Sequence, residues 1–495
     1  MSLSRRVFLG ASGASAAALT LPGCMTTNAA TGRRSYTGTY SAQDDVALGR
    51  KEHPKLLQAF GGEYNNRRLQ SYVSQIGGRL SQHTEYKQFP YQFTLLNSPI
   101  VNAFALPGGF VYVSRGLLAL GSNEAELAGV LAHELGHVNA RHSAERMSAG
   151  QLASLGVMAG AIGASLLGLP AQSVAQLGQQ VATMSIQSYS RKQEFEADTL
   201  GVRYMSRAGY DPEAMVTFLS TLREQSQVEA QSLGLKPGSV DQYNMMSTHP
   251  RTIDRVRAAT EHARVERVAS PRLGRQEYLS RIDGMLFGDD PSQGIVKGNS
   301  FVHPGLRFAF SVPEDFRINN SQERIVAQNR TGHTIVFDLA QMRAGDPGRH
   351  IRDEWAKGAE VADLERVQVD GSPAATGRAR VSGKSGQADV RMLAIQRDTG
   401  SAYRFMFIAP VGQTQAIDAM ARHTARSFNN LSSAEAAKVK PLRLQVRAAS
   451  ARDTVEGLSR SLPYGRMNPA WFRVLNDLSP REPLKARQPL KVIST

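Results

Sequence analysis

The stretch LAHELGH, residues 131–137, constrains the fold more than any other part of this 495-residue chain. Its two histidines, His133 and His137, are four residues apart, and side chains at that spacing lie on one face of an α-helix. Asn123 can cap such a helix, and the apolar residues around the motif gather on the other face. The sequence therefore predicts a helix that packs on one side and directs two imidazoles to one point on the other.

Two interpretations of this helix stay open from the motif alone. Imidazole nitrogens are common zinc ligands, and Glu134 between them could hold a water molecule and serve as a general base. The alternative is a pair of core histidines that are satisfied by hydrogen bonds. A zinc site needs a third ligand, and because Cys24 is the only cysteine, that ligand should be a histidine or a carboxylate.

The segment SRKQEFEADTLG, residues 190–201, supplies a candidate third ligand on a second predicted helix. Glu194 can bind a metal, while Asp198, four residues later, can orient a ligand imidazole through a hydrogen bond. Glu196 points elsewhere on the helix and is the weaker candidate. A solvated acidic face is the alternative interpretation of these carboxylates.

Four stretches in order, NAFALPGG, LAHELGHV, SRKQEFEAD and STHPRTIDR, together resemble the zinc metallopeptidase family of HtpX, the CAAX prenyl proteases and BepA. The resemblance covers about residues 40–270. It implies a gluzincin site that holds one zinc ion, with Glu134 as the catalytic base and Asp198 as the residue that orients a ligand. The implied zinc ligands are His133, His137 and Glu194.

The same resemblance places His249 and Arg255 near the active site, where either can stabilise an oxyanion. In BepA-like members the histidine can also cap the zinc in a latent state. A turn histidine and a surface arginine are the alternative interpretation. We expect His142, in the nearby NARH stretch, to be structural.

The predicted fold class is α+β: a mainly helical zincin-type peptidase domain with a small edge sheet, an α+β domain and a small basic C-terminal module. We place their boundaries at 41–290, 294–430 and 438–495. A strand is expected within FALPGGFVYVSRGLL, where the edge from Phe104 to Val113 can hold an extended peptide or be an ordinary sheet strand. The C-terminal module resembles the β-α-α-β layout of LysM glycan-binding modules, with a structural cap as the alternative.

The N-terminus predicts export. Residues 1–23 resemble a twin-arginine and lipoprotein signal, with Cys24 as the lipidated residue and 24–40 as a flexible linker. Met25 after that cysteine favours the periplasmic face of the outer membrane by resemblance to lipoproteins. The uncharged run 152–169 is just long enough to span a bilayer, but we expect it to be a helix or lid over the cleft.

Composition restricts the partners. The net charge of +15 suggests an anionic neighbour, and the segment 431–495 holds 12 Lys and Arg against 5 Asp and Glu. Export argues against nucleic acid, and no base-reading motif accompanies the basic tail.

We therefore expect a zinc-dependent endopeptidase that hydrolyses unfolded or misassembled envelope proteins in periplasmic quality control, tethered to the membrane through Cys24. Peptidoglycan is a candidate partner of the C-terminal module. The alternative is an envelope assembly or cell-wall-binding factor with a largely latent peptidase site.

Overall fold

The computed structural model describes residues 25–36, 40–148, 189–232, 268–320, 324–383 and 386–495, together with four single residues (Gly234, His249, Ala258 and Glu261). Four sequence predictions lie outside this part: the signal at 1–23, the lipidation site Cys24, the segment 152–169 and Arg255. Within the described ranges, no helix combines the length and the apolar character needed to cross a bilayer.

Helix α5 (Glu124–Asn139) lies at the centre of the peptidase region, and each of its residues is buried. Its first turn is capped by Asn123, whose side chain accepts a hydrogen bond from the backbone N–H of Glu126. Three other helices pack against it: α3 (Arg67–Ser81), α8 (Arg191–Arg207) and α9 (Glu213–Ser232). The predicted motif helix is therefore confirmed, but it is surrounded on all sides rather than half-exposed.

Two glycines allow α5 and α8 to approach closely. A Cβ atom at Gly136 would lie 2.6 Å from the carbonyl oxygen of Ala197, and one at Gly201 would lie 3.2 Å from the backbone nitrogen of His133. The first distance is shorter than real Cβ contacts and the second is tighter than most of them, so glycine favours the close approach at both crossing points. The close crossing brings the histidine face of α5 against the acidic face of α8.

A three-stranded sheet in the order β3-β5-β4 lies beside α5. Its strands are β3 (Gln92–Leu96), β4 (Ala103–Leu106) and β5 (Phe110–Ser114), and β5 runs parallel to β3 and antiparallel to β4. Gly108 and Gly109 turn the chain between β4 and β5 with φ values of 78° and 99°. The predicted strand is thus a hairpin, with β4 at the edge of the sheet.

One long and one short helix flank this sheet. Helix α2 (Ala42–Ala59) packs near the edge strand β4, and α4 (Arg115–Leu120) leads directly from β5 toward α5. A Cβ atom at Gly108 would lie 2.5 Å from the Cα of Val46, so the β4–β5 turn touches the backbone of α2. These contacts fix the edge strand relative to the motif helix.

Residues 25–36 form a small hairpin where the sequence suggested part of a flexible linker. Strand β1 (Met25–Thr27) pairs antiparallel with β2 (Arg34–Tyr36). Between them, the buried Asn28 side chain donates a 2.9 Å hydrogen bond to the carbonyl of Asn139 at the end of α5. The difference from the expectation arises from this long-range contact, since the segment itself has no hydrophobic periodicity.

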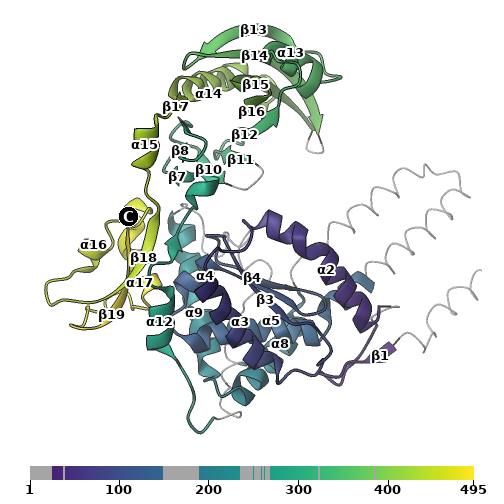
Figure 1. The fold of residues 1–495 in the computed structure, drawn as a ribbon, viewed down its shortest axis with the longest axis vertical. Helices are drawn as coiled ribbons and strands as arrows, with labels where there is room; N and C mark the ends of the chain where they lie inside the picture. Colours follow the sequence, from purple (N-terminus) through teal and green to yellow (C-terminus); the bar gives the residue numbers. More distant parts are fainter. Residues whose placement is uncertain are drawn as a thin grey trace, which may run out of the picture.

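A β-rich domain lies at one end of the long axis of the molecule (Figure 1). Its larger sheet has seven strands in the order β10-β11-β12-β16-β15-β14-β13, and its smaller sheet has four in the order β17-β9-β8-β7. Helix α14 (Thr414–Ser427) packs against both sheets over a largely aromatic core. The strands are β7 (Ile295–Lys297), β8 (Ser300–His303), β9 (Phe308–Ser311), β10 (Arg317–Asn320), β11 (Ile325–Gln328), β12 (Thr334–Gln341), β13 (Ala362–Val369), β14 (Ser372–Gly383), β15 (Gly386–Asp398), β16 (Ser401–Pro410) and β17 (Asn429–Asn430).

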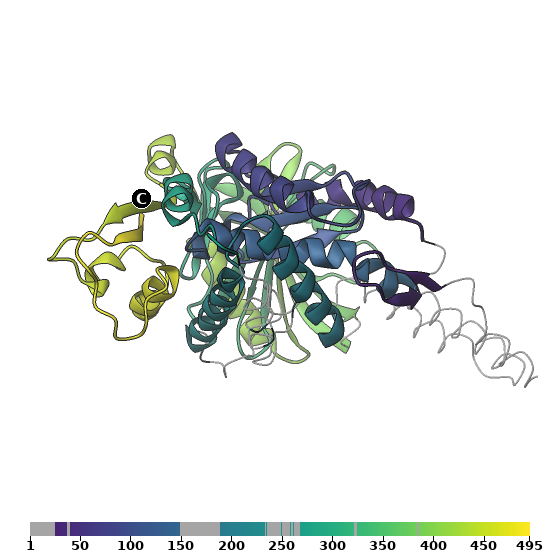
Figure 2. The same cartoon turned by 90° about the horizontal axis from the view of Figure 1, so that it is seen from below.

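The C-terminal segment has the predicted β-α-α-β order, and it packs on the peptidase region. Its elements are β18 (Leu442–Ala448), α16 (Val455–Leu458), α17 (Asn468–Leu475) and β19 (Pro489–Ser494). Strand β18 also pairs with β6 (Leu286–Phe287), which follows α12 (Arg275–Ile282). Figures 1 and 2 both show this segment at one side of the molecule and β1 at the other.

One hydrophobic core joins the C-terminal segment to the peptidase helices. Phe472 and Ile493 belong to the same buried cluster as Leu131 of the motif helix. The fully buried Lys491 ammonium donates three hydrogen bonds of 2.7–3.0 Å to the carbonyls at the end of α4, those of Ala119, Leu120 and Gly121. The described part of the chain is α+β, as predicted, and its first and last segments, residues 25–36 and 442–494, both pack against the helices around α5.

Candidate metal centre

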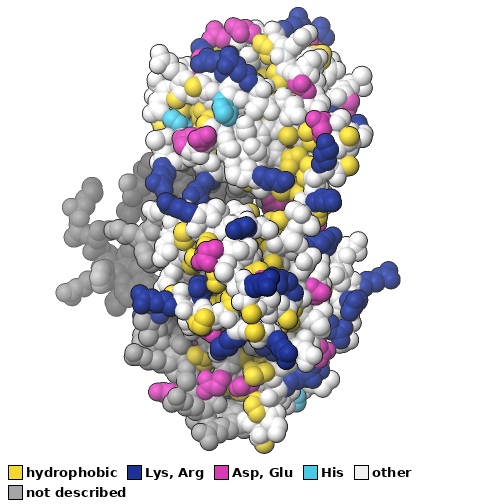
Figure 3. Space-filling view, turned by 90° about the vertical axis from the view of Figure 1, so that its left-hand side faces the viewer, with side chains coloured by type: hydrophobic (Ala, Val, Ile, Leu, Met, Phe, Trp, Pro, Cys, Tyr) yellow, Lys and Arg dark blue, Asp and Glu magenta, His cyan; other side chains and the backbone are white. Residues whose placement is uncertain are grey.

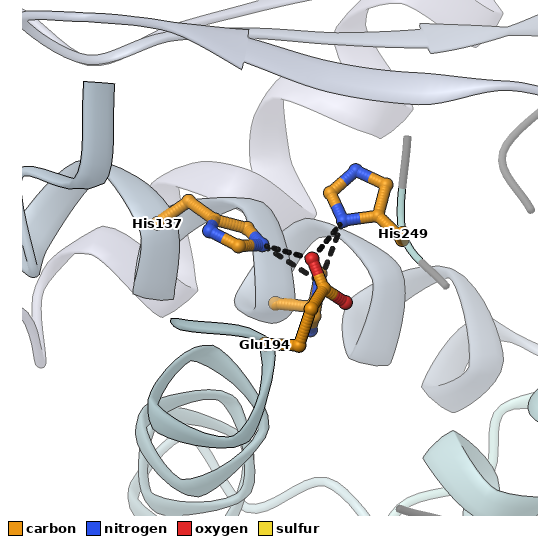
Figure 4. A group of neighbouring side chains, drawn as sticks. His137, Glu194 and His249 are labelled. Atoms are coloured by element: carbon orange, nitrogen blue, oxygen red, sulfur yellow. Dashed lines mark hydrogen bonds and ion pairs between the residues drawn. The ribbon is translucent and has the colours of Figure 1, made fainter. Parts of the chain in front are cut away.

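Four side chains from three separate segments meet beside α5: His133, His137, Glu194 and His249. One potential ligand atom from each lies within 4.8 Å of the others. The two Nε2 atoms of His133 and His137 are 3.0 Å apart, and Glu194 Oε1 lies 3.3 Å from His137 Nε2. Figure 4 shows three of them, His137, Glu194 and His249, pointing toward one another. Among the residues that the structure describes, no second group of this kind is present.

His249 lies between the other members of the group. Its Nδ1 atom is 2.9 Å from Glu194 Oε1 and 3.2 Å from His133 Nε2. Its Nε2 atom is 3.4 Å from Glu134 Oε1. The predicted proximity of His249 to the motif is therefore present in the structure.

The group is withdrawn from solvent, since all four members have exposed fractions of 3% or less. Burial lowers the pKa of His137 well below its ordinary value, which keeps its imidazole neutral. Burial opposes the ionisation of Glu194, but the facing imidazoles of His249 and His137 outweigh it and hold the pKa of that carboxyl below its ordinary value. A neutral imidazole at His137 and an ionised carboxylate at Glu194 are the protonation states in which these two groups bind a divalent metal.

Asp198 contacts the outer side of the first histidine. Its Oδ1 atom lies 2.9 Å from Nδ1 of His133, while the Nε2 atom of that ring faces the group. A carboxylate on Nδ1 fixes the tautomer that leaves Nε2 free to bind a metal. The relation between Glu194 and Asp198 on one face of α8 thus has the form that their spacing predicted.

Three residues around His137 were missed or undervalued by sequence reasoning, two in contact with its ring and one behind it. His142 Nδ1 lies 2.8 Å from His137 Nδ1, and Glu196 contacts His142 rather than the group. Tyr189 stacks on the His137 ring at 3.7 Å between centroids. The RH pair after the motif and the EFEAD spacing carry a signal for the first two residues; no periodicity marks Tyr189.

The surroundings of Glu134 indicate whether this site suits a metal ion. Its side chain is completely buried, and neither carboxylate oxygen accepts a hydrogen bond from any residue in the described part of the chain. An isolated buried carboxylate is costly unless a cation or a water molecule compensates it. Three imidazoles and a carboxylate are donors that zinc prefers, so the residues present fit such an ion.

A small hollow connects the group to the edge of the sheet. It is lined by Ala105 and Leu106 of β4 on one side, and by His137 and Tyr189 on the other. Since β4 is the edge strand, its main chain borders the same hollow as a candidate ligand.

Comparison with known proteins gives a consistent result. Residues 67–263 match the model of Peptidase family M48. The chain is 34% identical over 265 residues to a beta-barrel assembly-enhancing protease of Yersinia pestis, covering 52% of each chain. It is 32% identical over 251 residues to the protein of that name from Escherichia coli K12, covering 50% of this chain and 49% of the relative.

A eukaryotic relative is also similar. The mitochondrial metalloendopeptidase OMA1 of Schizosaccharomyces pombe is 33% identical over 217 residues, which are 42% of this chain and 60% of that protein. The chain thus spans about half the length of the bacterial relatives it matches. The likeness includes the segments that supply the four clustered side chains.

Proposed function

Because residues 67–263 form a domain of Peptidase family M48, we propose that this chain is a zinc-dependent endopeptidase. His133, His137 and Glu194 would hold one zinc ion. The observation that carries the proposal is the convergence of these donors, from the two helices α5 and α8, within one buried group. Such a grouping of buried titratable side chains is typical of a functional site rather than of ordinary packing.

Glu134 is the proposed general base. When bound, zinc supplies Lewis acidity that activates a water molecule and polarises a peptide carbonyl. Glu134 is buried beside the group and has oxygens available to take the proton from the attacking water and to return it to the leaving amine. Asp198 would hold the His133 ring in its ligand orientation.

His249 and Arg255 keep proposed roles near the substrate carbonyl. Contacts of His249 with Glu194 and His133 support a capping role, because a catalytic zinc site needs an open fourth position and this imidazole borders the three ligands. The proposal for Arg255 as an oxyanion-stabilising residue is supported by its place in the STHPRTIDR motif alone.

The edge strand β4 is the proposed site for the substrate backbone. Its other side pairs with β5, so an extended peptide can add to the free edge through main-chain hydrogen bonds. This mode reads backbone rather than side chains, which suits an enzyme that acts on unfolded segments. Envelope proteins as substrates and quality control in the periplasm are supported by the names of the bacterial relatives.

Localisation and domain organisation belong to the same proposal. The N-terminal pattern supports export, lipidation at Cys24 and attachment to the periplasmic face of the outer membrane. We assign residues 41–290 to the peptidase domain, 294–430 to a domain that packs or binds partners, and 438–495 to the LysM-like module. Peptidoglycan is the proposed partner of that module. On the face that carries it, Lys and Arg are spread among other side chains (Figure 3).

A second candidate function is an assembly or cell-wall-binding factor whose peptidase site is mostly latent. The burial of His249 at 1% exposure within the group favours this alternative. Deletion of residues from 294 onward would not separate the two candidates cleanly, because the core of the peptidase region includes C-terminal residues. The full chain is therefore the sample to use.

The experiment compares the full chain with Glu134→Gln by metal analysis and by cleavage of a permanently unfolded test protein. We expect one zinc per chain in both samples and cleavage only by the wild type. Undiminished turnover by pure Glu134→Gln, or a wild type that binds no zinc, would reject the proposed function. The latent alternative would be supported if the wild type binds zinc without cleaving the test protein and a His249 variant cleaves it.

A further inference from the structure

The outer face of His137 is held in an unusual way. The His133 ring contacts a carboxylate directly, whereas Nδ1 of His137 lies 2.8 Å from Nδ1 of a second imidazole, that of His142. His142 is completely buried, and its two ring nitrogens face two different partners, so one can accept a hydrogen bond while the other donates one.

The hydrogen positions then follow from the contacts. Nε2 of His137 faces the group, so its hydrogen is on Nδ1 and is donated to Nδ1 of His142. The remaining N–H of His142, on Nε2, points at Glu196 Oε2 at 3.1 Å. Each ring nitrogen therefore has a single consistent role, and the chain of hydrogen bonds ends on a carboxylate.

Arg33 holds that carboxylate from the other side. Its Nε atom is 2.8 Å from Glu196 Oε1, and its Nη2 atom is 2.6 Å from Glu145 Oε1. Both carboxylates are shielded, with side-chain exposures of 17% and 13%, so these pairs are less screened than surface ones. One guanidinium thereby joins Glu196 on α8 to Glu145, which follows α5.

Arg33 belongs to the N-terminal hairpin, and that hairpin is fastened at two further points. Asn28 donates to the carbonyl of Asn139 at 2.9 Å, and Arg203 on α8 donates to the carbonyl of Ala30 at 3.3 Å. The hairpin therefore spans the crossing of α5 and α8 at the end where His137 lies. The hairpin therefore packs against the site.

We propose that Arg33, Glu196 and His142 form a positioning chain that fixes the His137 imidazole for metal binding. This proposal rests on the proposed zinc site, and it makes the hairpin at residues 25–36 a working part of that site. Outer partners of metal ligands set ring orientation and ligand basicity, and their loss lowers metal affinity by about 10- to 100-fold. Asp198 contacts the His133 ring directly, whereas Glu196 would act on the His137 ring through the intervening imidazole of His142.

The test uses the full chain and measures zinc affinity by competition with a fluorescent chelator. Arg33→Ala, Glu196→Gln and His142→Ala should each weaken zinc binding by about 10-fold or more. The matched control is Arg34→Ala, which removes an exposed arginine from the same hairpin and should bind zinc as the wild type does. Arg33→Lys restores the charge and should recover part of the affinity.

A second readout separates positioning from simple stability. The cobalt-substituted protein should show a shifted visible absorption spectrum in His142→Ala and Glu196→Gln, because the His137 ring changes its orientation. If Arg33→Ala fails to fold, Glu196→Gln preserves the side-chain shape and carries the test. Equal zinc affinity and equal cobalt spectra in Arg34→Ala and the three variants would overturn the positioning chain while leaving the proposed peptidase intact. A wild type that binds no zinc would overturn both.

Discussion

The Nε2 atom of His249 lies 3.4 Å from an oxygen of Glu134, the proposed base. The other nitrogen of the same ring lies 2.9 Å from Glu194, a proposed ligand. One imidazole therefore occupies the space between the base and the metal position, where an attacking water molecule has to stand. In the proposed zinc enzyme this arrangement would be closed, and access to the site would depend on the movement of this side chain.

Replacement of His249 by alanine should raise cleavage. The change removes the cap but leaves His133, His137 and Glu194, so zinc content should stay at one per chain. We expect kcat on an unfolded protein to increase by about 10-fold, which corresponds to a shift of about 1.4 kcal/mol in the balance between closed and open states. His83→Ala, outside the group, is the control. A lower kcat with unchanged KM would instead assign His249 to oxyanion stabilisation.

Asp198→Ala should weaken zinc binding. The His133 ring loses the acceptor at 2.9 Å that fixes its tautomer, so zinc affinity should fall by about 10- to 100-fold. Chelator competition measures the effect directly. Thr199→Ala on the same helix removes only a hydroxyl bonded to the carbonyl of Phe195, and it should bind zinc normally. Equal affinities in the two variants would remove Asp198 from the site.

Gly136→Ala should separate the two helices that carry the ligands. The new methyl group would meet the carbonyl oxygen of Ala197 at 2.6 Å, and overpacking of this kind costs about 1–3 kcal/mol. Urea unfolding should show that loss, together with weaker zinc binding. Gly78→Ala in α3 is the matched control, because a Cβ there meets nothing within 4 Å and the helix should gain about 0.5–1 kcal/mol. The same Gly→Ala change should therefore lower the free energy of unfolding at Gly136 and raise it at Gly78.

Lys491→Met should destabilise the whole peptidase region. The variant leaves three buried carbonyls at the end of α4 without their donor, which should cost about 3 kcal/mol of unfolding free energy. Lys485→Met is the control, because its side chain is 74% exposed. A single shared unfolding transition, shifted only by the first variant, is the expected observation. An unchanged transition midpoint for Lys491→Met would show that the C-terminal segment is loosely attached.

Local spacing was enough to predict the inner part of the site. The four-residue intervals between His133 and His137, and between Glu194 and Asp198, fix which side chains share a helix face, whatever the rest of the chain does. The meeting of Arg33 with Glu196 was not predictable in this way, because 163 residues separate them and neither lies in a periodic apolar pattern. The spacing of residues in a helix predicts which side chains of that helix lie together. It does not predict which of them a distant hairpin will contact.

The same distinction applies to the fold, where regular local patterns were predictable and long-range contacts were not. The α+β class followed from helical and alternating stretches, but β3 was missed because QFTLL is buried at four successive positions and does not alternate. Lys491 was counted with the basic tail, since a lysine in a charged segment is normally exposed. Its burial depends on three carbonyls of α4, some 370 residues earlier in the chain.

Lys491 also bears on how the protein is made. The ribosome synthesises α4 and α5 early, while the strand whose ammonium group binds the end of α4 emerges some 370 residues later. Until then, the nascent peptidase core lacks part of its apolar wall and the donor for three of its carbonyls. A chain still in translation therefore lacks a contact that completes this core, and the order of synthesis itself delays completion of the region that holds the clustered side chains.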